Sequence, residues 1–584
     1  MGYSFSNANI NLVEGFPPLE QAAGKYSFYD RRFSIDLSSG YVGGKLDRLD
    51  LSGSNLIVNN TEIKPYPAQI NLNSAGSLAT LPSLFNFADD YGFAQQQNTD
   101  GDIKLNGILK LPLKTKISTD DIKYKLFGVL ENIKIRDERF PFDIHSPKLA
   151  FKTNEGSLQL SGPLSIGEIS FDARFITGFG AQRAKITPRL EGKFSLSENI
   201  IEDLQLGVSK NWFSGSALAS VILDFPSDGD ATFRLTSDLK GLEVQIPEVG
   251  LLKNKKASSS FEVTGYISDN IYYDTMFISA EDFELNVSID NNEKYLIERL
   301  FRKDIFDVSG FASKDGLEFT GGKFNLANYL KFTEPKHKSK SGIPVSVNLD
   351  TLNITDSFYI DNFSTRFVSD SINGTFAGLF MGAEPVTGSF GSENGYRFAE
   401  ILSNDAGAFL QAAGLIKRGA EGKLNLRINR NADGIKGRLF TESLKIYDLP
   451  ALAKLLQSLS IIGLLEQMLG QGLFLSESEI NFRLDDKQYI IDRASFFGPS
   501  LGISLDGYLN RKDRLLDFQG VFSPIYAINS IGSVLTRKGE GLIGINFDLW
   551  GNPDTPKVLV NPFSVLTPGM FRDCLLYTSP SPRD

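Results

Sequence analysis

The chain has 584 residues, 41% of them hydrophobic and 22% charged, with a formal net charge of -10 at pH 7. A compact domain holds roughly 100–200 residues, so this length predicts several domains or one repetitive, elongated architecture. The mild negative charge is spread along the chain without basic clusters, which argues against nucleic acid as a partner.

The N-terminal stretch, MGYSFSNANINLVEG, has no basic region followed by an apolar run, so it does not read as a signal peptide. It reads instead as part of a strand. No run of about 18–20 apolar residues occurs anywhere, and we predict no segment that spans a bilayer. These features indicate that Met1 is an internal methionine of a longer protein or that the true start is missing.

Alternation with a period of two is the dominant pattern. On one face of a strand at 101–113 it places Ile103, Leu105, Leu109, Leu111 and Leu113, with Gly107 in the remaining position. The same pattern recurs at 146–161, around an Asn-Glu-Gly turn, and at 166–176, 232–238, 259–267, 276–288, 345–353, 423–428, 479–485 and 501–509. Strict alternation predicts a sheet with one apolar and one wet face. Without a fixed-period repeat, a long curved antiparallel sheet fits better than a propeller or an ideal solenoid.

Short helices are expected to interrupt this sheet. The clearest covers 448–468, where Leu452, Leu455, Leu456 and Leu459 follow helical spacing and a break is expected between Ser458 and Gly463. Further helices are predicted at 291–303, at 399–414 with Gly414 as its C-terminal cap, and at 524–537. The leucine stripe favours core packing; the functional alternative is a helix that gates the mouth of a groove or lies on a membrane.

Catalytic and metal motifs match only formally. GPSLG at 498–502 has the pattern of a nucleophile elbow around Ser500, but a strand pattern follows where that elbow needs a helix. GEGLIG at 539–544 resembles a dinucleotide-binding turn and is also followed by a strand pattern. The two histidines, His145 and His337, are expected in solvated loops. We therefore predict a protein that is not an enzyme and has no metal and no cofactor.

The last 180 or so residues carry several linked motifs: SNDAGAFLQAAGLIKRGAEGKLNL from 403, DLPALAKLLQSLS from 448, GPSLGISLDGYL from 498 and KGEGLIGINFDLWGNPDTPKVLVNPFSVLTPGMFR from 538. In this order they resemble the C-terminal region of AsmA-like, YhdP-type envelope proteins. The positions that fit the family pattern are Asp405, Ala406, Gly407, Asn529, Gly539, Gly541, Pro553, Pro556, Asn561, Pro562, Ser564, Pro568, Gly569 and Arg572. Phe563, Thr567 and Met570 depart from it.

The resemblance implies a mainly β fold: an elongated, curved antiparallel β-sheet groove (a β-taco of the bridge-like lipid-transfer type) with a few short helices. Residues 1–390 would be a repetitive β-groove region, truncated at its N-terminus, and 391–572 the AsmA-like C-terminal region. Residues 573–584, which include the single cysteine, Cys574, resemble translated sequencing adapter and are a probable artefactual tail.

The function that the resemblance implies is non-enzymatic transport of phospholipid across the periplasm of a Gram-negative bacterium, for outer-membrane lipid homeostasis. Phospholipid acyl chains would be the ligand. A missing N-terminal helix would anchor the protein in the inner membrane, and its C-terminal end would reach the outer membrane or an envelope partner. The alternatives are a structural or assembly factor for outer-membrane proteins and, third, an adhesin or carbohydrate-binding β-solenoid.

Candidate groove-lining residues follow from the alternation, because one face of each strand would hold acyl chains. Each methylene of an acyl chain gains about 0.8 kcal/mol on burial. The lining candidates are Ile103, Leu105, Leu158, Leu160, Leu424, Leu426 and Ile428, and the candidates on a groove-gating helix are Leu452, Leu455, Leu456 and Leu459.

Overall fold

The structure is a computed structural model, and it describes all residues except 1, 12–16, 45–46, 81–98, 116, 118–120, 137–142, 179–181, 205–208, 247–250, 291–293, 333–341, 370, 394–395, 432–433, 449, 485–486, 511, 525–542, 554 and 567–584. It is mainly β with a few short helices, as the sequence predicts. The chain divides into two compact units, Met1–Ile289 and Asp290–Asp584. The predicted boundary near residue 390 lies inside the second unit and stays a prediction.

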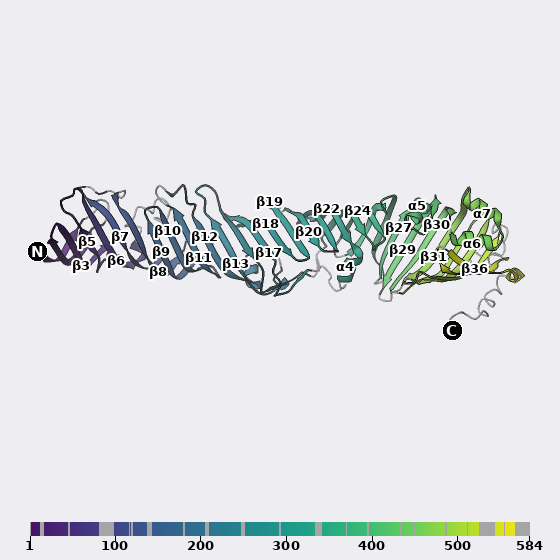
Figure 1. The fold of residues 1–584 in the computed structure, drawn as a ribbon, viewed down its shortest axis with the longest axis horizontal. Helices are drawn as coiled ribbons and strands as arrows, with labels where there is room; N and C mark the ends of the chain where they lie inside the picture. Colours follow the sequence, from purple (N-terminus) through teal and green to yellow (C-terminus); the bar gives the residue numbers. More distant parts are fainter. Residues whose placement is uncertain are drawn as a thin grey trace. The chain divides into compact units, whose positions relative to one another are not determined.

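The first unit is a meander in which most strands pair with the next strand in the chain (Figure 1). Its strands are β1 (Gly2–Ile10), β2 (Leu19–Tyr29), β3 (Arg32–Gly43), β4 (Arg48–Asp50), β5 (Asn55–Val58), β6 (Tyr66–Ser77), β7 (Thr99–Leu113), β8 (Lys123–Ile135), β9 (Ile144–Asn154), β10 (Ser157–Ile166), β11 (Ile169–Gly178), β12 (Arg189–Ser197), β13 (Phe213–Asp224), β14 (Ala231–Ser237), β15 (Leu242–Ile246), β16 (Leu251–Lys253), β17 (Ser260–Ile267), β18 (Ile271–Ala280) and β19 (Phe283–Asp290). Three short helices accompany them: η1 (Leu78–Thr80), α3 (Glu198–Asp203) and η5 (Lys210–Trp212). The strand β14 pairs with β17, and the hairpin β15–β16 extends β13 as a side sheet.

The second unit is a meander of the same kind (Figure 1). Its strands are β20 (Lys294–Arg302), β21 (Phe306–Ser313), β22 (Gly316–Asn325), β23 (Pro344–Asn353), β24 (Tyr359–Val368), β25 (Ser371–Phe380), β26 (Glu384–Glu393), β27 (Tyr396–Ser403), β28 (Arg418–Ala420), β29 (Lys423–Asn431), β30 (Gly434–Asp448), β31 (Leu473–Leu484), β32 (Gln488–Phe497), β33 (Leu501–Asn510), β34 (Leu516–Pro524), β35 (Ile545–Asn552) and β36 (Thr555–Asn561). Its helices are α4 (Leu326–Phe332), α5 (Ala406–Ala412), α6 (Pro450–Ser458), α7 (Ile462–Leu469) and η8 (Pro562–Leu566). The pairing of β22 with β23, across α4, is parallel.

Bulges bend the strands of both units. The pairing of β9 with β10 shifts register next to Gly162 (φ 144°), and that of β32 with β33 shifts opposite Gly507 (φ 146°). Asn362, also in the left-handed region at φ 49°, lies in a register shift between β24 and β25. An extra residue on one strand bends it and increases its twist, so repeated bulges curve the sheet.

The helix predictions are partly confirmed. The segment 448–468 forms α6 and α7 with the expected break after Ser458. From 399–414 only α5 is helical, because residues 399–403 belong to β27; Gly414 follows the helix with φ 70°, as a C-terminal glycine should. The helix predicted at 291–303 is wrong, since residues 294–302 form β20. The one at 524–537 lies outside the described residues, apart from Pro524, which ends β34.

Candidate functional site

One face of the sheet in the second unit is apolar from strand to strand. Directly opposed residues make an unbroken row from β20 to β36 that passes every strand except β28, and we call it the central row. Its members are Ile297, Gly310, Phe319, Val347, Thr365, Phe376, Gly388, Ile401, Leu426, Leu439, Ile480, Ala494, Leu505, Gly520, Phe547 and Val560. No charged residue occurs in it.

A second apolar row runs beside the central row, two residues along each strand except β32, where a bulge makes the step three residues. From β25 to β36 its members are Gly374, Phe390, Ala399, Ile428, Gly437, Phe482, Ile491, Gly507, Phe518, Leu549 and Val558. Two parallel rows make the apolar strip several side chains wide. We call the surface that carries both rows the apolar face.

The first unit has an equivalent apolar face. One row runs through Leu105, Gly128, Phe151, Leu160, Phe175, Leu190, Leu223, Phe233, Gly265 and Tyr273. A neighbouring row runs through Gly162, Ala173, Gly192, Val221, Leu235, Val263, Met276 and Val287. The period-two alternation therefore places like residues side by side over many strands in both units.

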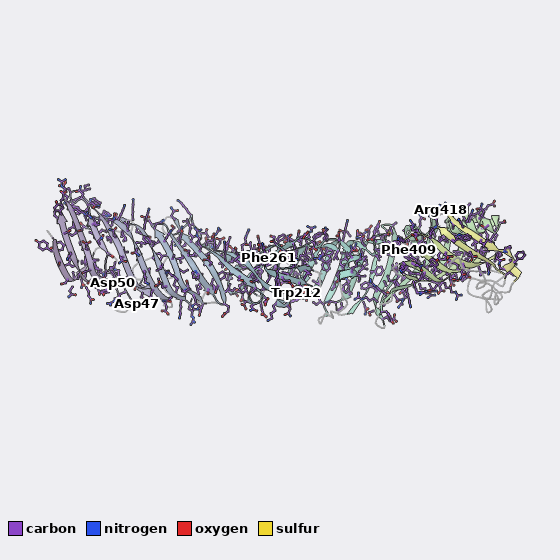
Figure 2. The ribbon with its side chains drawn as sticks, turned by 60° about the horizontal axis from the view of Figure 1, so that its bottom comes forward. Asp47, Asp50, Trp212, Phe261, Phe409 and Arg418 are labelled. Atoms are coloured by element: carbon purple, nitrogen blue, oxygen red, sulfur yellow. The ribbon has the colours of Figure 1, made fainter. Side chains whose placement is uncertain are left out.

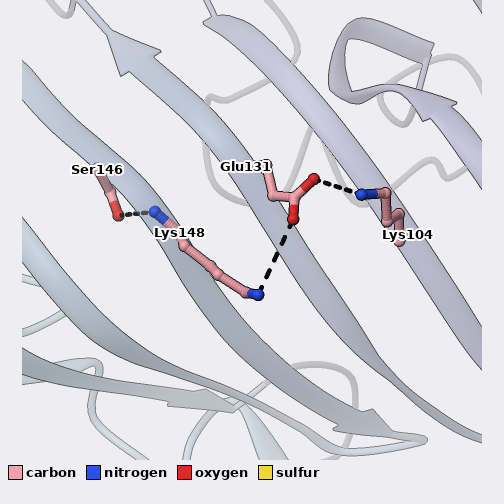
Figure 3. A network of polar contacts seen from close by, with 4 residues as sticks. All are labelled: Lys104, Glu131, Ser146 and Lys148. Carbon is pink, nitrogen blue, oxygen red and sulfur yellow. Dashed lines mark hydrogen bonds and ion pairs between the residues drawn. The ribbon is translucent and has the colours of Figure 1, made fainter.

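The opposite face of each sheet carries charge. In the first unit, Glu131 of β8 lies between two lysines, with Lys104 Nζ at 2.7 Å and Lys148 Nζ at 4.0 Å from its carboxylate oxygens (Figure 3). The hydrogen bond from Lys104 holds the pKa of Glu131 below its ordinary value. In the second unit, Arg438 and Glu479 make an equivalent cross-strand pair at 2.8 Å. Such exposed pairs contribute little stability, but they mark this face as the wet one.

The structure brings the four lining candidates of the first unit together. Ile103 and Leu105 are buried in one hydrophobic cluster, and Leu158 and Leu160 pack against it as partly buried members. Leu105 and Leu160 lie in the same row, separated by Gly128 and Phe151. These residues belong to one continuous surface, although they come from β7 and β10.

In the second unit, exposure changes along β29. Leu424 is buried, at 2% exposure, whereas Leu426 and Ile428 are half-buried. The same gradient recurs on β33, where Ile503 is buried and Leu505 is half-buried. The apolar face is thus sealed toward one end of the strands and more accessible toward the other.

Helices account for the sealed end. The helix α6 packs against the last strand, β36, and α7 packs against β30 and β31 (Figure 1). Of the four candidates on the predicted gating helix, Leu452, Leu455 and Leu456 are buried and Leu459 is half-buried. Leu473 and Leu475 of β31, a strand that α7 contacts, are buried as well.

The helix α5 closes the same apolar face further along. Asp405 caps it, its Oδ1 accepting a hydrogen bond from the Ala408 N–H at 2.9 Å. Phe409, which is labelled in Figure 2, stacks on Phe380 at the end of β25, with ring centroids 4.2 Å apart. The match of Asp405 to the family pattern therefore has a structural reason, because this cap fixes where α5 begins.

A segment of the first unit also reaches its apolar face. The Tyr273 hydroxyl, on β18, donates a hydrogen bond to the Leu204 carbonyl just after α3. The ring of Tyr273 packs edge-on against Phe233, 5.8 Å away, and burial raises the pKa of its phenol to about 12. Leu204, the residue directly after α3, is therefore attached to the apolar row at β18.

The formal motifs have structural roles in the described parts. GPSLG lies in the turn between β32 and β33, so Ser500 is followed by a strand and not by the helix of a nucleophile elbow. His145 is exposed, as expected, but on β9 and not in a loop. GEGLIG is described only at 543 and 544, and His337 and Cys574 lie outside the described residues, as do positions 573–584.

The described ranges contain no group of three or more His, Cys, Asp or Glu side chains arranged to hold a metal ion. None of the helices described is long and apolar enough to cross a membrane.

Two arginines at the edge of the apolar face were missed in the sequence. Arg397 and Arg430 are directly opposed on β27 and β29. The signal was present in the alternation, because Arg430 follows Leu426 and Ile428 with the same period of two. A single charged residue at the end of an apolar strand is common, because strand ends are usually solvated. Its significance becomes visible only when its cross-strand neighbour is known.

Comparison of the chain with family models, with curated proteins and with solved structures finds no match. The resemblance to AsmA-like proteins therefore depends on the motifs of residues 403–572 themselves.

Proposed function

We propose that this chain is a non-enzymatic phospholipid carrier of the AsmA-like, YhdP-type class, whose apolar face is the floor of a groove for acyl chains. The observation that carries the proposal is the central row. It offers an uncharged path across the strands of the second unit that is apolar except at Thr365, and the rows through Leu105 and Val263 offer a similar path in the first unit.

The pattern of burial supports a groove more than a conventional core. In the central row, Ile401 and Leu439 on either side of Leu426 are buried, whereas Leu426 itself is only half-buried. Ile428 and Phe482 in the second row are half-buried too, so the face is covered in part and not throughout. Acyl chains laid across such positions would leave water at a gain of about 0.8 kcal/mol per methylene. The bulges that curve the sheet would turn the apolar face into its inner surface.

The cellular setting is proposed from the resemblance. The protein would lie in the periplasm of a Gram-negative bacterium, anchored in the inner membrane through a preceding helix, and would pass phospholipid between the two membranes. Its C-terminal end would meet the outer membrane or an envelope partner. The charged face would then be in contact with solvent.

A matched pair of substitutions on one strand tests the groove. Ile428→Asp places a carboxylate on the half-buried apolar face, while Asn429→Asp places the same charge on the opposite face beside Lys436. We expect the purified full chain to carry phospholipid detectable by native mass spectrometry. Ile428→Asp should lose most of it with an unchanged circular dichroism spectrum, and Asn429→Asp should retain it.

Two outcomes would count against the carrier. If the wild-type chain carries no lipid, the carrier proposal is contradicted. The alternative, a structural or assembly factor for outer-membrane proteins, is then favoured. Unfolding of Ile428→Asp, to the extent expected for Leu424→Asp, would show that Ile428 belongs to a closed core. Transfer of labelled phospholipid between donor and acceptor vesicles gives the corresponding functional measurement.

A further inference from the structure

The apolar face of the second unit ends in a pair of opposed arginines. Arg397 continues the face of β27 two residues beyond Ala399, and Arg430 continues that of β29 two residues beyond Ile428. The two arginines are cross-strand partners, so their Cβ atoms are about 5 Å apart. Both side chains are exposed.

These arginines differ from their neighbours in having no partner among the described residues. On the opposite face, Arg427 pairs with Glu393 at 2.6 Å and stacks on Phe398, and Arg438 pairs with Glu479 and lies over Phe440. Directly opposed like charges destabilise a sheet. Two guanidinium groups held side by side, with no acidic partner in the described part of the chain, therefore make a site that favours an anion.

The surroundings of the pair define the kind of anion. Two residues along a strand correspond to about 6.6 Å, so Ala399 and Ile428 lie within the reach of one ligand that also contacts the arginines. From there the apolar row continues through Gly437 to Phe482. Guanidinium groups match the oxygens of a phosphate with two parallel hydrogen bonds. A ligand with a phosphate at one end and hydrocarbon at the other fits both surfaces.

We propose that Arg397 and Arg430 bind the phosphate of an anionic phospholipid while its acyl chains lie on the apolar face beside Ile428. This inference rests on the proposed carrier function and adds to it a headgroup site. The arginines would fix the headgroup at the edge of the groove, where the phosphate stays hydrated on its outer side.

Binding of two labelled lipids with identical acyl chains tests the site. Fluorescent phosphatidylglycerol carries the phosphate, and fluorescent diacylglycerol lacks it. In the full chain, Arg397→Gln with Arg430→Gln should weaken phosphatidylglycerol binding by about tenfold, the effect of losing charge-assisted hydrogen bonds, and leave diacylglycerol binding unchanged. The matched control, Arg427→Gln with Arg438→Gln, removes the same charge from the opposite face and should change neither.

The remaining outcomes separate the alternatives. Equal loss of both lipids in the Arg397/Arg430 variant, or equal loss of phosphatidylglycerol in the control, would overturn the headgroup site. Displacement of bound phosphatidylglycerol by inorganic phosphate alone would show a free-phosphate site and also overturn it. If the wild type binds both lipids equally and the variant does the same, the headgroup site fails while the carrier function stands. If the wild type binds neither lipid, the carrier function itself fails.

A check on folding accompanies this test. Since the substitutions relieve repulsion between two charges, the lipid-free Arg397/Arg430 variant should unfold at a temperature no lower than the wild type. A lower unfolding temperature would mean that the arginines support the sheet and would contradict the assignment.

Discussion

The ring of Phe482 lies against the backbone of Gly437, its directly opposed partner on β30. The same relation recurs wherever an apolar row alternates between a large ring and a bare backbone. Other such pairs are Phe151 with Gly128, Phe233 with Gly265, Phe376 with Gly388, Phe518 with Gly507 and Phe547 with Gly520. Each ring occupies the space that a side chain on the glycine would need. This relation gives the high Phe and Gly contents a common structural use.

We predict that Gly437→Ala destabilises the second unit by about 1–3 kcal/mol, because its Cβ would lie 2.6 Å from Phe482 Cε2 in an overpacked site. Urea unfolding followed by Trp550 fluorescence measures this, in a Trp212→Phe background where Trp550 is the remaining tryptophan. The control is Gly463→Ala on α7, where the new methyl group meets nothing within 4 Å. It should be neutral or stabilising by up to about 1 kcal/mol. Equal losses in both variants would contradict the packing argument.

The sequence predicted the strands well where alternation is strict and failed where a bulge interrupts it. In β20, Ile297 and Leu300 are spaced like residues on one face of a helix, which produced the wrong helix at 291–303. A register shift between them adds one residue, so both lie on the apolar face of a strand. A bulge thus converts a spacing of two into a spacing of three, and the sequence alone does not distinguish this from a helical turn.

The candidate site was predictable in type but not in extent. Alternation correctly placed Leu426 and Ile428 on one face. It did not show that Leu424, on the same face, is buried, because burial depends on which elements pack over the face and not on the alternation within β29. The opposition of Arg397 and Arg430 depends on the pairing of β27 with β29 across α5, which no local pattern specifies.

The helix α6 should behave as a fixed part of the core. Leu456 is fully buried, so Leu456→Ala should cost about 2–5 kcal/mol of the second unit's free energy of unfolding. Leu469→Ala at the end of α7, where the leucine is 61% exposed, is the matched change and should cost little. Urea unfolding measures both. A negligible effect of Leu456→Ala would instead favour a helix that is loosely held and able to gate the groove.

Alkaline pH should destabilise the first unit through two tyrosines. Burial raises the pKa of Tyr124 and of Tyr273 from 10.0 to about 12. Because the folded state holds these protons more tightly, the stabilisation is complete below pH 10 and is lost as the pH rises through about 12. Partial exposure limits the loss to about 2 kcal/mol per phenol. Ultraviolet titration should show two phenols that ionise at a higher pH than the exposed tyrosines.

Substitution separates this effect from general alkaline unfolding. The double variant Tyr124→Phe and Tyr273→Phe should lose less stability between pH 10 and 12 than the wild type, as measured by urea unfolding followed by Trp212 fluorescence in a Trp550→Phe background. The matched variant is Tyr29→Phe, because Tyr29 is 81% exposed. It should follow the wild type. If the double variant also loses as much stability as the wild type, the phenols of Tyr124 and Tyr273 are not responsible for the loss between pH 10 and 12.

On the charged face, the ionised carboxylate of Asp548 on β35 destabilises the folded state at neutral pH. Loss of hydration raises the pKa of its carboxyl above the ordinary 3.8, and the charge of Asp517 adds to the rise. The folded state therefore prefers the protonated acid. The resulting penalty is absent below pH 3.8 and complete once the pH exceeds the raised value. Asp548→Asn should stabilise the second unit at neutral pH by about 0.5 kcal/mol, discounted for solvent screening.

This gain should shrink as the pH falls toward 3.8 and as salt is added, and urea unfolding over that range measures it. Asp506→Asn is the control, because Asp506 accepts a hydrogen bond from Gln519 Nε2 at 2.9 Å and should not gain stability when its charge is removed. A gain from Asp548→Asn that persists unchanged at the acidic end would have to come from something other than the charge, because the wild-type carboxyl is already neutral there.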